Sequence, residues 1–468
     1  MNMAGFAQAA TNLVGGYMHK RVLVIAASLC VGSLPAAAQT ATNIAVLKGL
    51  APLTVLKSSY AGEAALASNF TVTGGIQTGS VRQSILLPFA DQQQQALRDA
   101  FITSGNFAQL ADGLGTTLGS AYLARAHYTD RQHFTSISPG VAGLIAYTNA
   151  TTRDDSNSAK FFFANGTTDG KQAVSDEAME IIKKIGGVPD TFGTNYGRPA
   201  GSPGSDAYGN SRPFQTEPQV IPIVGVDYFN APADNIVYNR GPVMNLTDSP
   251  SFPSGHTTYG YAGAILLAVL VPERYQQMIA RGAEYGNSRI LMGAHYAMDV
   301  LGGRTLATYD LAHLLANDPA YTGRTLRGAP VISDYQAAIK AARAEIATIL
   351  QASCGDTMQA CAAHDVSRFN NTATNEASYA ATQTYGLPVV YPQNAGKVED
   401  VGKLAPEAGY LLTAAFPALS LDEANQILTE TQGPGGGFLD NGSSFGVYSR
   451  LNLYAAAGRA AELARKKN

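Results

Sequence analysis

The sequence predicts a mainly α-helical fold, a helical bundle with long irregular loops and an appended C-terminal segment. Two observations support this prediction. Apolar residues recur at helical spacing in several segments after residue 84, which is typical of helices that bury one face. The chain of 468 residues also contains 48 glycines and 22 prolines, so many turns must separate the helices.

The expected elements follow one another along the chain. Residues 39–80 are polar and contain Thr, Ser and Gly, so we expect them to be irregular. A helix over 173–185 should begin near Ser175 and stop at Gly186. Residues 186–252 contain repeated Gly, Pro, Asn and Asp, which predicts a long loop, and a loop of this length is usually either functional or disordered. Further helices are expected over 84–101, 110–124, 257–280, 286–303, 333–352, 421–430 and 453–466.

The first 38 residues are typical of an export signal. A basic stretch ends at Arg21, an apolar run follows, and small residues precede Gln39. We expect cleavage after Ala38 and a periplasmic or secreted protein. No later segment is long and apolar enough to predict a membrane span. The regions expected are a signal peptide (1–38), an N-terminal irregular and helical segment (39–140), a helical core (141–350) and a C-terminal segment (351–468).

Export determines the expected state of the cysteines. Cys30 leaves with the signal, whereas Cys354 and Cys361 remain. In an oxidising compartment a pair this close is expected to form a local disulfide that fixes one surface loop. A zinc site would need further ligands, and no second thiol pair is nearby.

The charge balance excludes one class of partner. The chain has 32 Lys and Arg against 35 Asp and Glu, a formal net charge of −3. Proteins that bind nucleic acid rely on a basic surface to neutralise phosphates, and no local run supplies one. We therefore expect no nucleic-acid partner. The sequence leaves the oligomeric state open.

The first motif with chemical content is Phe252-Pro253-Ser254-Gly255-His256. It lies where a loop turns into the helix expected from 257, so free backbone N–H groups and the positive end of the helix dipole point at one spot. An oxyanion fits there. Gly255 lets the backbone approach closely, Ser254 can donate its hydroxyl, and His256 lies in the first turn beside the same anion.

The second motif combines Arg289 with His295 and Asp299. On one helix, positions 295 and 299 share a face, so the carboxylate could hold one imidazole nitrogen as N–H and leave the other as a bare nucleophile or base. Arg289 provides a bidentate guanidinium for phosphate-like oxygens. Taken singly, a capped helix start or a helix-surface pair explains each motif more simply. Their occurrence together within residues 253–299 favours an anion site.

The stretch 251–304 resembles the type 2 phosphatidic acid phosphatase superfamily, and most of all its bacterial class A non-specific acid phosphatases. The superfamily also includes lipid phosphatases and vanadium haloperoxidases. The residues that carry the resemblance are Ser-Phe-Pro-Ser-Gly-His-Thr-Thr from Ser251, Glu-Tyr-Gly-Asn-Ser-Arg ending at Arg289, and Gly-Ala-His-Tyr-Ala-Met-Asp ending at Asp299. It implies a helical phosphatase core.

The family's first motif, Lys-x6-Arg-Pro, is incomplete in this chain. Arg212-Pro213-Phe214 matches its Arg-Pro end, but Ser205 stands where the phosphate-binding lysine is expected. Two explanations stay open: Lys183 or Lys184 reaches the site, or the site works with fewer cations. Arg212 itself could also be an ordinary loop salt bridge.

The resemblance implies a mechanism without a cofactor or metal. His295 would attack phosphorus to form a phosphohistidine, Asp299 would orient it, and His256 would protonate the leaving group and then activate water. Arg212, Arg289, Ser254 and the Gly255 N–H would hold the phosphate oxygens. An exported protein without a membrane anchor favours small water-soluble phosphate esters as substrates.

Two alternatives remain. A vanadium-dependent haloperoxidase-like enzyme would use the same pocket, with vanadate bound to His295. The incomplete first motif also permits a non-catalytic phosphate-binding protein.

Overall fold

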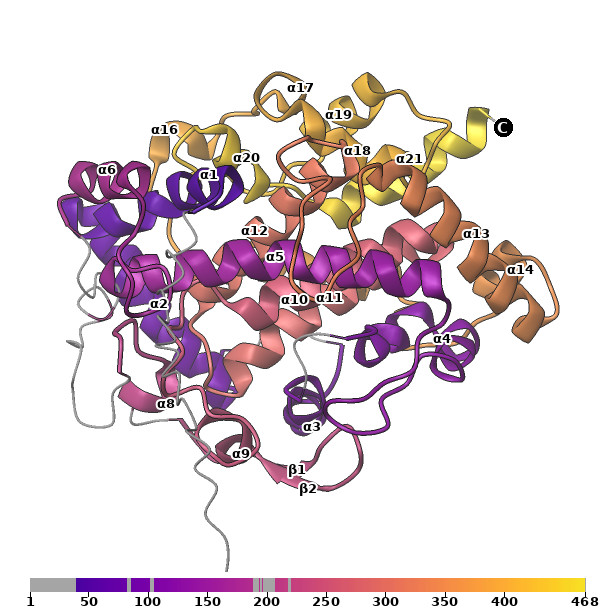
Figure 1. Ribbon diagram of the computed structural model, residues 1–468, viewed down its shortest axis with the longest axis horizontal. Helices are drawn as coiled ribbons and strands as arrows, with labels where there is room; N and C mark the ends of the chain where they lie inside the picture. Colours follow the sequence, from indigo (N-terminus) through magenta and orange to yellow (C-terminus); the bar gives the residue numbers. More distant parts are fainter. Residues whose placement is uncertain are drawn as a thin grey trace, which may run out of the picture. The chain divides into compact units, whose positions relative to one another are not determined.

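Helix α10 (Gly255–Leu270) lies at the centre of the fold, and every residue from His256 to Leu270 is buried. The helix is apolar on all sides beyond its first turns, which is why other helices surround it. It packs against α5 (Pro139–Asn165), α11 (Tyr275–Leu291) and α12 (Ala297–Leu315), and α5 runs across it in Figure 1. The prediction of a mainly α-helical fold is therefore confirmed.

This computed structural model describes residues 39–81, 86–101, 105–187, 193, 196, 207–217 and 220–467. The predicted export signal lies outside these residues. The described residues form one compact unit, and its division at 140 and 350 stays a prediction. No helix in the described ranges is both long enough and apolar enough to cross a membrane.

The segment 39–80 is helical, so the expectation of an irregular segment is wrong. Thr40 caps the first helix, accepting a hydrogen bond from Asn43 N, and Ser59 caps α2 through Gly62 N. Capping and burial against the core outweigh the weak helix propensity of the Thr, Ser and Gly residues. The elements before the core are α1 (Ala41–Leu50), η1 (Ala51–Ser58), α2 (Tyr60–Thr78), α3 (Phe89–Asp99), η2 (Ala108–Leu114) and α4 (Thr116–Leu123).

The two helices expected over 257–280 and 286–303 are three helices. Pro272 begins a short 3₁₀ turn, η3 (Pro272–Arg274), and interrupts the first expected helix, because proline cannot donate a backbone hydrogen bond. Gly293 has φ +69°, a left-handed conformation, and α11 ends just before it at Leu291, in the middle of the second expected helix. His295 consequently lies in a turn between α11 and α12, a correction to the expectation that one helix carries both His295 and Asp299.

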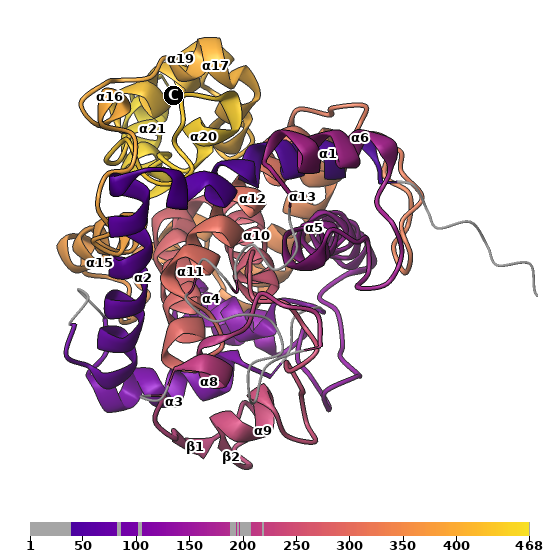
Figure 2. The same cartoon turned by 90° about the vertical axis from the view of Figure 1, so that its left-hand side faces the viewer.

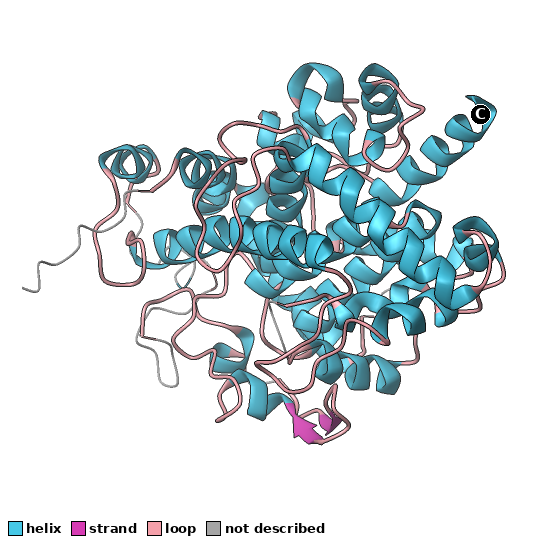
Figure 3. Cartoon of the chain, turned by 45° about the vertical axis from the view of Figure 1, so that its right-hand side comes forward, coloured by secondary structure: helices cyan, strands magenta, loops and turns pink. Residues whose placement is uncertain are grey.

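Between α5 and α10, the described residues form a few short elements joined by irregular stretches, and from residue 207 onward this agrees with the loop predicted over 186–252. Helix α6 begins after Ser175, which accepts a hydrogen bond from Ala178 N, and the chain leaves it through Gly186 at φ +80°. Two short strands pair antiparallel, with Val224 opposite Asp234, and Figure 3 shows them at one edge of the helical fold. The elements are α6 (Asp176–Lys184), α8 (Pro213–Thr216), β1 (Val224–Val226), β2 (Pro232–Asp234) and α9 (Asn235–Asn239).

The last C-terminal helices, from α16 onward, cover one end of the core, and Figure 2 shows α16, α17, α19, α20 and α21 gathered there. The predictions over 333–352, 421–430 and 453–466 are confirmed by α13, α19 and α21. The elements are α13 (Tyr335–Cys354), α14 (Met358–Ala363), α15 (Thr372–Thr384), α16 (Pro392–Ala395), α17 (Val401–Leu404), η4 (Pro406–Gly409), α18 (Tyr410–Thr413), α19 (Leu421–Glu430), α20 (Ser444–Tyr448) and α21 (Leu453–Lys467).

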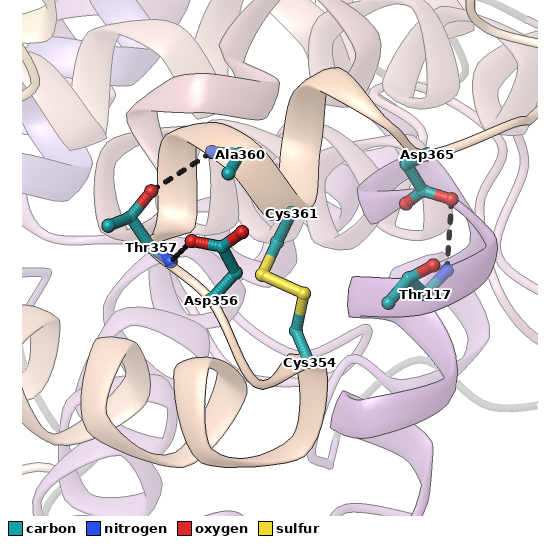
Figure 4. Close-up of a disulfide and its surroundings, with 7 residues drawn as sticks. All are labelled: Thr117, Cys354, Asp356, Thr357, Ala360, Cys361 and Asp365. Carbon is teal, nitrogen blue, oxygen red and sulfur yellow. Dashed lines mark hydrogen bonds between the residues drawn. A yellow bond between two sulfur atoms is a disulfide. The ribbon is translucent and has the colours of Figure 1, made fainter.

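The predicted disulfide between Cys354 and Cys361 is present. It joins the last residue of α13 to α14, and Figure 4 shows it beside the Thr357 side chain that caps α14. Nearby, Asp365 accepts a hydrogen bond of 2.9 Å from Thr117 N of α4. The bridge and this contact attach the loop to the core.

Candidate active site

Two chain turns build the site. One is the loop that enters α10 at Ser254, and the other is the turn from α11 to α12 that contains His295. They meet through a hydrogen bond of 3.0 Å from Ser254 N to Asp299 O. The imidazoles of His256 and His295 face this junction, with ring centroids 6.1 Å apart.

Asp299 holds the turn that carries His295. It is the third residue of α12, and its Oδ2 accepts a hydrogen bond of 2.8 Å from Tyr296 N. Asp299 Oδ2 also lies 3.5 Å from His295 Nδ1. The Ser251 hydroxyl lies between the two residues: it donates a hydrogen bond to Asp299 Oδ2, and its oxygen is 3.3 Å from His295 Nδ1. The two residues therefore meet through helix capping, whereas the sequence suggested neighbouring positions on one helix.

Helix α2 secures the start of α12. Asn69 Oδ1 accepts a hydrogen bond of 3.0 Å from Met298 N, and Thr73 Oγ1 accepts one of 3.0 Å from Ala297 N. The first amides of a helix have no partner within the helix, so these two side chains satisfy them. The segment that the sequence suggested was irregular thus fixes the helix that carries Asp299.

Arg212 is fully buried and reaches the other side of His295. Its Nη1 lies 2.9 Å from His295 Nε2 and donates to Ala294 O at 3.0 Å, while Nε donates to Ser249 O at 2.7 Å. A guanidinium has only donors, so this contact requires a lone pair on Nε2 and places the imidazole proton on Nδ1. Because Arg212 is buried against His295, it is not the ordinary loop salt bridge that the sequence left as an alternative.

Arg289 lies in the last turn of α11 and is fully buried. Among the described residues, none accepts a hydrogen bond from its three guanidinium nitrogens. Burying an unpaired cation is costly, and such a group is usually satisfied by an anion. His256 Nε2 is likewise buried without a partner in the described part of the chain. The two groups lie close enough for the charge of Arg289 to lower the pKa of His256, after burial, which is the larger cause.

Ser254 and Gly255 begin α10. Ser254 is the N-cap, and its Oγ accepts a hydrogen bond of 3.1 Å from Thr257 N, which leaves its hydroxyl hydrogen free to donate. Gly255 follows as the first helical residue, and His256 is the second. The structure therefore brings together all seven residues that the sequence indicated: Arg212, Ser254, Gly255, His256, Arg289, His295 and Asp299.

Burial and positive charge control protonation here. Burial first, and then the nearby arginines, hold the pKa of both His256 and His295 well below the usual value of 6.5. Burial raises the pKa of Asp299 to about 6, although its hydrogen bonds from Ser251 and Tyr196 act in the opposite direction. Without a bound anion the imidazoles are neutral. A bound phosphate would reverse this, because its negative charge favours protonated histidine.

The structure adds Lys160 of α5, which the sequence gave no reason to select. Its side chain is buried and lines a cavity of ≈ 260 Å³ together with Gly255, His256 and Ser249. Lys183, by contrast, is exposed and pairs with Glu180, and Lys184 is also exposed. Neither of these lysines reaches the site, which corrects that expectation. Ser205 lies outside the described residues.

Residues 202–318, which span both turns, match the sequence profile described as "PAP2 superfamily". This match confirms the resemblance to that superfamily seen in the sequence, over this part of the chain. The chain is also similar to bacterial acid phosphatases.

Three relatives show the extent of this similarity. The chain is 44% identical over 69 residues to a non-specific acid phosphatase of Salmonella typhimurium, which covers 15% of this chain and 28% of that protein. It is 44% identical over 64 residues to an acid phosphatase of Zymomonas mobilis (14% and 24%), and 39% identical over 72 residues to a non-specific acid phosphatase of Providencia stuartii (15% and 29%). The chain thus aligns with less than a third of the length of these relatives.

Proposed function

We propose that the protein is a phosphatase that hydrolyses small water-soluble phosphate monoesters through a phosphohistidine. The observation that carries this proposal is the buried Arg289, which lacks a partner among the described residues and lies beside two neutral imidazoles. Such a group fits a phosphoryl group between His295 and His256. The names of the acid phosphatases to which the chain is similar support the same activity.

The first step forms the bond from His295 Nε2 to phosphorus and breaks the bond from phosphorus to the ester oxygen. Nε2 has the lone pair because the proton is on Nδ1, which faces Asp299 and Ser251. Arg212 Nη1 donates to this lone pair, so in the proposed step it turns to a phosphate oxygen of the bound ester and releases Nε2 for attack. The leaving oxygen takes a proton from His256, whose pKa rises once the dianion is bound. In the second step the neutral His256 accepts a proton from water, the water oxygen bonds to phosphorus, and His295 is released.

Charge in the transition state spreads over the three remaining phosphate oxygens. Arg289, Arg212, the Ser254 hydroxyl and the Gly255 amide at the start of α10 would bind these oxygens. In this proposal the two arginines and the helix N-terminus neutralise the charge, with no metal ion or cofactor.

The experiment is a pair of assays on purified protein and on His295→Ala. We expect the parent protein to hydrolyse p-nitrophenyl phosphate and the variant to lose this activity. Bromide oxidation in the presence of vanadate and peroxide, without phosphate ester hydrolysis, would instead favour a haloperoxidase-like enzyme. Phosphate binding without turnover at any pH would identify a binding protein.

We also propose that the protein acts in the periplasm or outside the cell. The disulfide between Cys354 and Cys361 is compatible with an oxidising compartment. Export predicts that the mature chain starts at Gln39, which Edman sequencing of the native protein would test. A native chain that retains its first residues would contradict it.

A further inference from the structure

We propose that Lys160, from the long helix α5, binds the substrate's phosphate and replaces the lysine that is missing seven residues before Arg212. This inference rests on the proposed function for its chemistry. It assigns a substrate-binding role to a residue 52 positions upstream of Arg212, on an element separate from both chain turns of the site.

The position of the ammonium supports the proposal. A β-carbon built at Gly255 would lie 2.9 Å from Lys160 Nζ and 3.4 Å from Ser156 Oγ. The ammonium therefore lies against the backbone at the start of α10, and a β-carbon at position 255 would force it to shift. Lys160, Gly255 and His256 line the same cavity, at the N-terminus of α10.

The charges around Lys160 favour an anion. Arg212 and Arg289 repel the Lys160 ammonium, whereas the charge of the Asp299 carboxylate favours the charged form of this lysine. No ion pair or hydrogen bond to Lys160 occurs within the described ranges. The charged and titratable groups around it are Arg153 on α5, Arg212, Arg289, Asp299, His256 and His295. Burial and the arginines lower the pKa of Lys160 to about 7, so a bound phosphate would be the partner that keeps it charged.

A purely structural role for Lys160 predicts different behaviour. A buried lysine that only fills space contributes through its methylene stem, and methionine would replace it at little cost. A lysine that stabilises the fold through charge would need a paired carboxylate. Substitution by methionine therefore separates a phosphate contact from both structural roles.

The experiment uses Lys160→Met and Lys160→Arg, with the exposed Lys184→Met as the control. Inorganic phosphate binding is measured by isothermal titration calorimetry at pH 8, in two buffers that differ in ionisation enthalpy. We expect Lys160→Met to weaken phosphate binding about ten- to a hundredfold, the effect of losing a charge-assisted hydrogen bond. Lys160→Arg should restore part of the affinity, and Lys184→Met should match the parent protein.

Proton uptake provides a second readout. The parent protein should take up protons when phosphate binds at pH 8, because Lys160 becomes charged, and Lys160→Met should take up fewer. Unchanged phosphate affinity and unchanged proton uptake in a folded Lys160→Met protein would overturn the proposal, as would a parent protein that does not bind phosphate.

The two proposals can fail separately. If Lys160→Met loses phosphate affinity but the parent protein hydrolyses no ester, the Lys160 contact stands and the phosphatase proposal fails. If the parent protein hydrolyses p-nitrophenyl phosphate and Lys160→Met keeps the parent KM and kcat, the phosphatase proposal stands and the Lys160 contact fails. Far-UV circular dichroism establishes that each variant is folded.

Discussion

The guanidinium of Arg212 lies 2.9 Å from Nε2 of His295. This contact identifies Nε2 as the imidazole nitrogen with the lone pair, because the guanidinium can only donate. Attack by Nε2 in the proposed mechanism then requires the guanidinium to turn to a phosphate oxygen. It also places a permanent charge beside the proposed nucleophile, and that charge lowers the pKa of His295. The arginine therefore has two separable effects, one on phosphate binding and one on protonation.

Substitutions of Arg212 should separate these effects. Arg212→Lys keeps the charge but loses the fork of donors, so kcat/KM should fall about 10²- to 10³-fold. The acid limb of its pH profile, the pH range in which kcat/KM falls on acidification, should stay where it is in the parent protein. In Arg212→Ala the pKa of His295 rises towards its usual value, and since attack needs neutral His295, the acid limb of kcat/KM should move to higher pH. The pH profiles of both variants, with the exposed Arg327→Ala as control, test this. Identical acid limbs in Arg212→Ala and Arg212→Lys would exclude the electrostatic effect.

The contact between α2 and α12 should contribute to both stability and activity. Thr73→Ala removes the acceptor for Ala297 N, and leaving a buried amide unpaired should lower the free energy of unfolding by about 1–3 kcal/mol. Thr71→Ala, on the exposed face of the same helix, is the matched control and should change it by less than about 0.5 kcal/mol. Urea unfolding measures both variants. Equal effects would show that the cap on α12 is not important.

Two buried carboxyl groups should make stability depend on pH. Asp155 of α5 and Asp310 of α12 are both buried; the charge of Asp154 raises the pKa of Asp155, and the charge of Asp155 raises the pKa of Asp310. Burial is the larger cause, and it raises the pKa of Asp155 to about 7 from 3.8. A raised carboxyl pKa in the folded protein means that stability falls as pH rises from about 4 to 7.

Asp155→Asn removes the part of this dependence that Asp155 contributes, because the amide does not ionise. Relative to the parent protein, the variant should therefore gain about 1–3 kcal/mol in unfolding free energy between pH 5 and pH 8. The hydrogen bonds that Asp155 accepts from Thr42 and Asn43 are compatible with an amide oxygen. Urea unfolding at both pH values gives the comparison. A constant difference between the two proteins would contradict the raised pKa.

Sequence patterns predicted the helices whose ends carry local signals. Ser175 before α6 and the Gly186 that follows it are examples, and α19 matches its predicted bounds. Helix α2 was missed because its Thr and Gly residues have low helix propensity and its stability comes from burial against the core. The same reason applies to α5, a helix of 27 residues with many Thr, Asn and Asp.

The site was predictable where its residues are close in sequence. The loop with Ser254 and the turn with His295 each form a short motif, and Arg212 follows from its Arg-Pro-Phe context. Lys160 has no such local signal, because only the packing of α5 against α10 brings it to Gly255. The link between Asp299 and His295 was predicted, but its geometry was not, since Gly293 ends α11 before His295.

Trapping the covalent intermediate tests the central claim most directly. In His256→Ala the first step should proceed with p-nitrophenyl phosphate, whose leaving group needs no proton, whereas the second step lacks its base. Rapid quenching in alkali followed by peptide mass spectrometry should find phosphate on His295, with a burst of one p-nitrophenolate per active site. His295→Ala should give neither. Phosphate on another residue, or full activity of His295→Ala, would contradict the account.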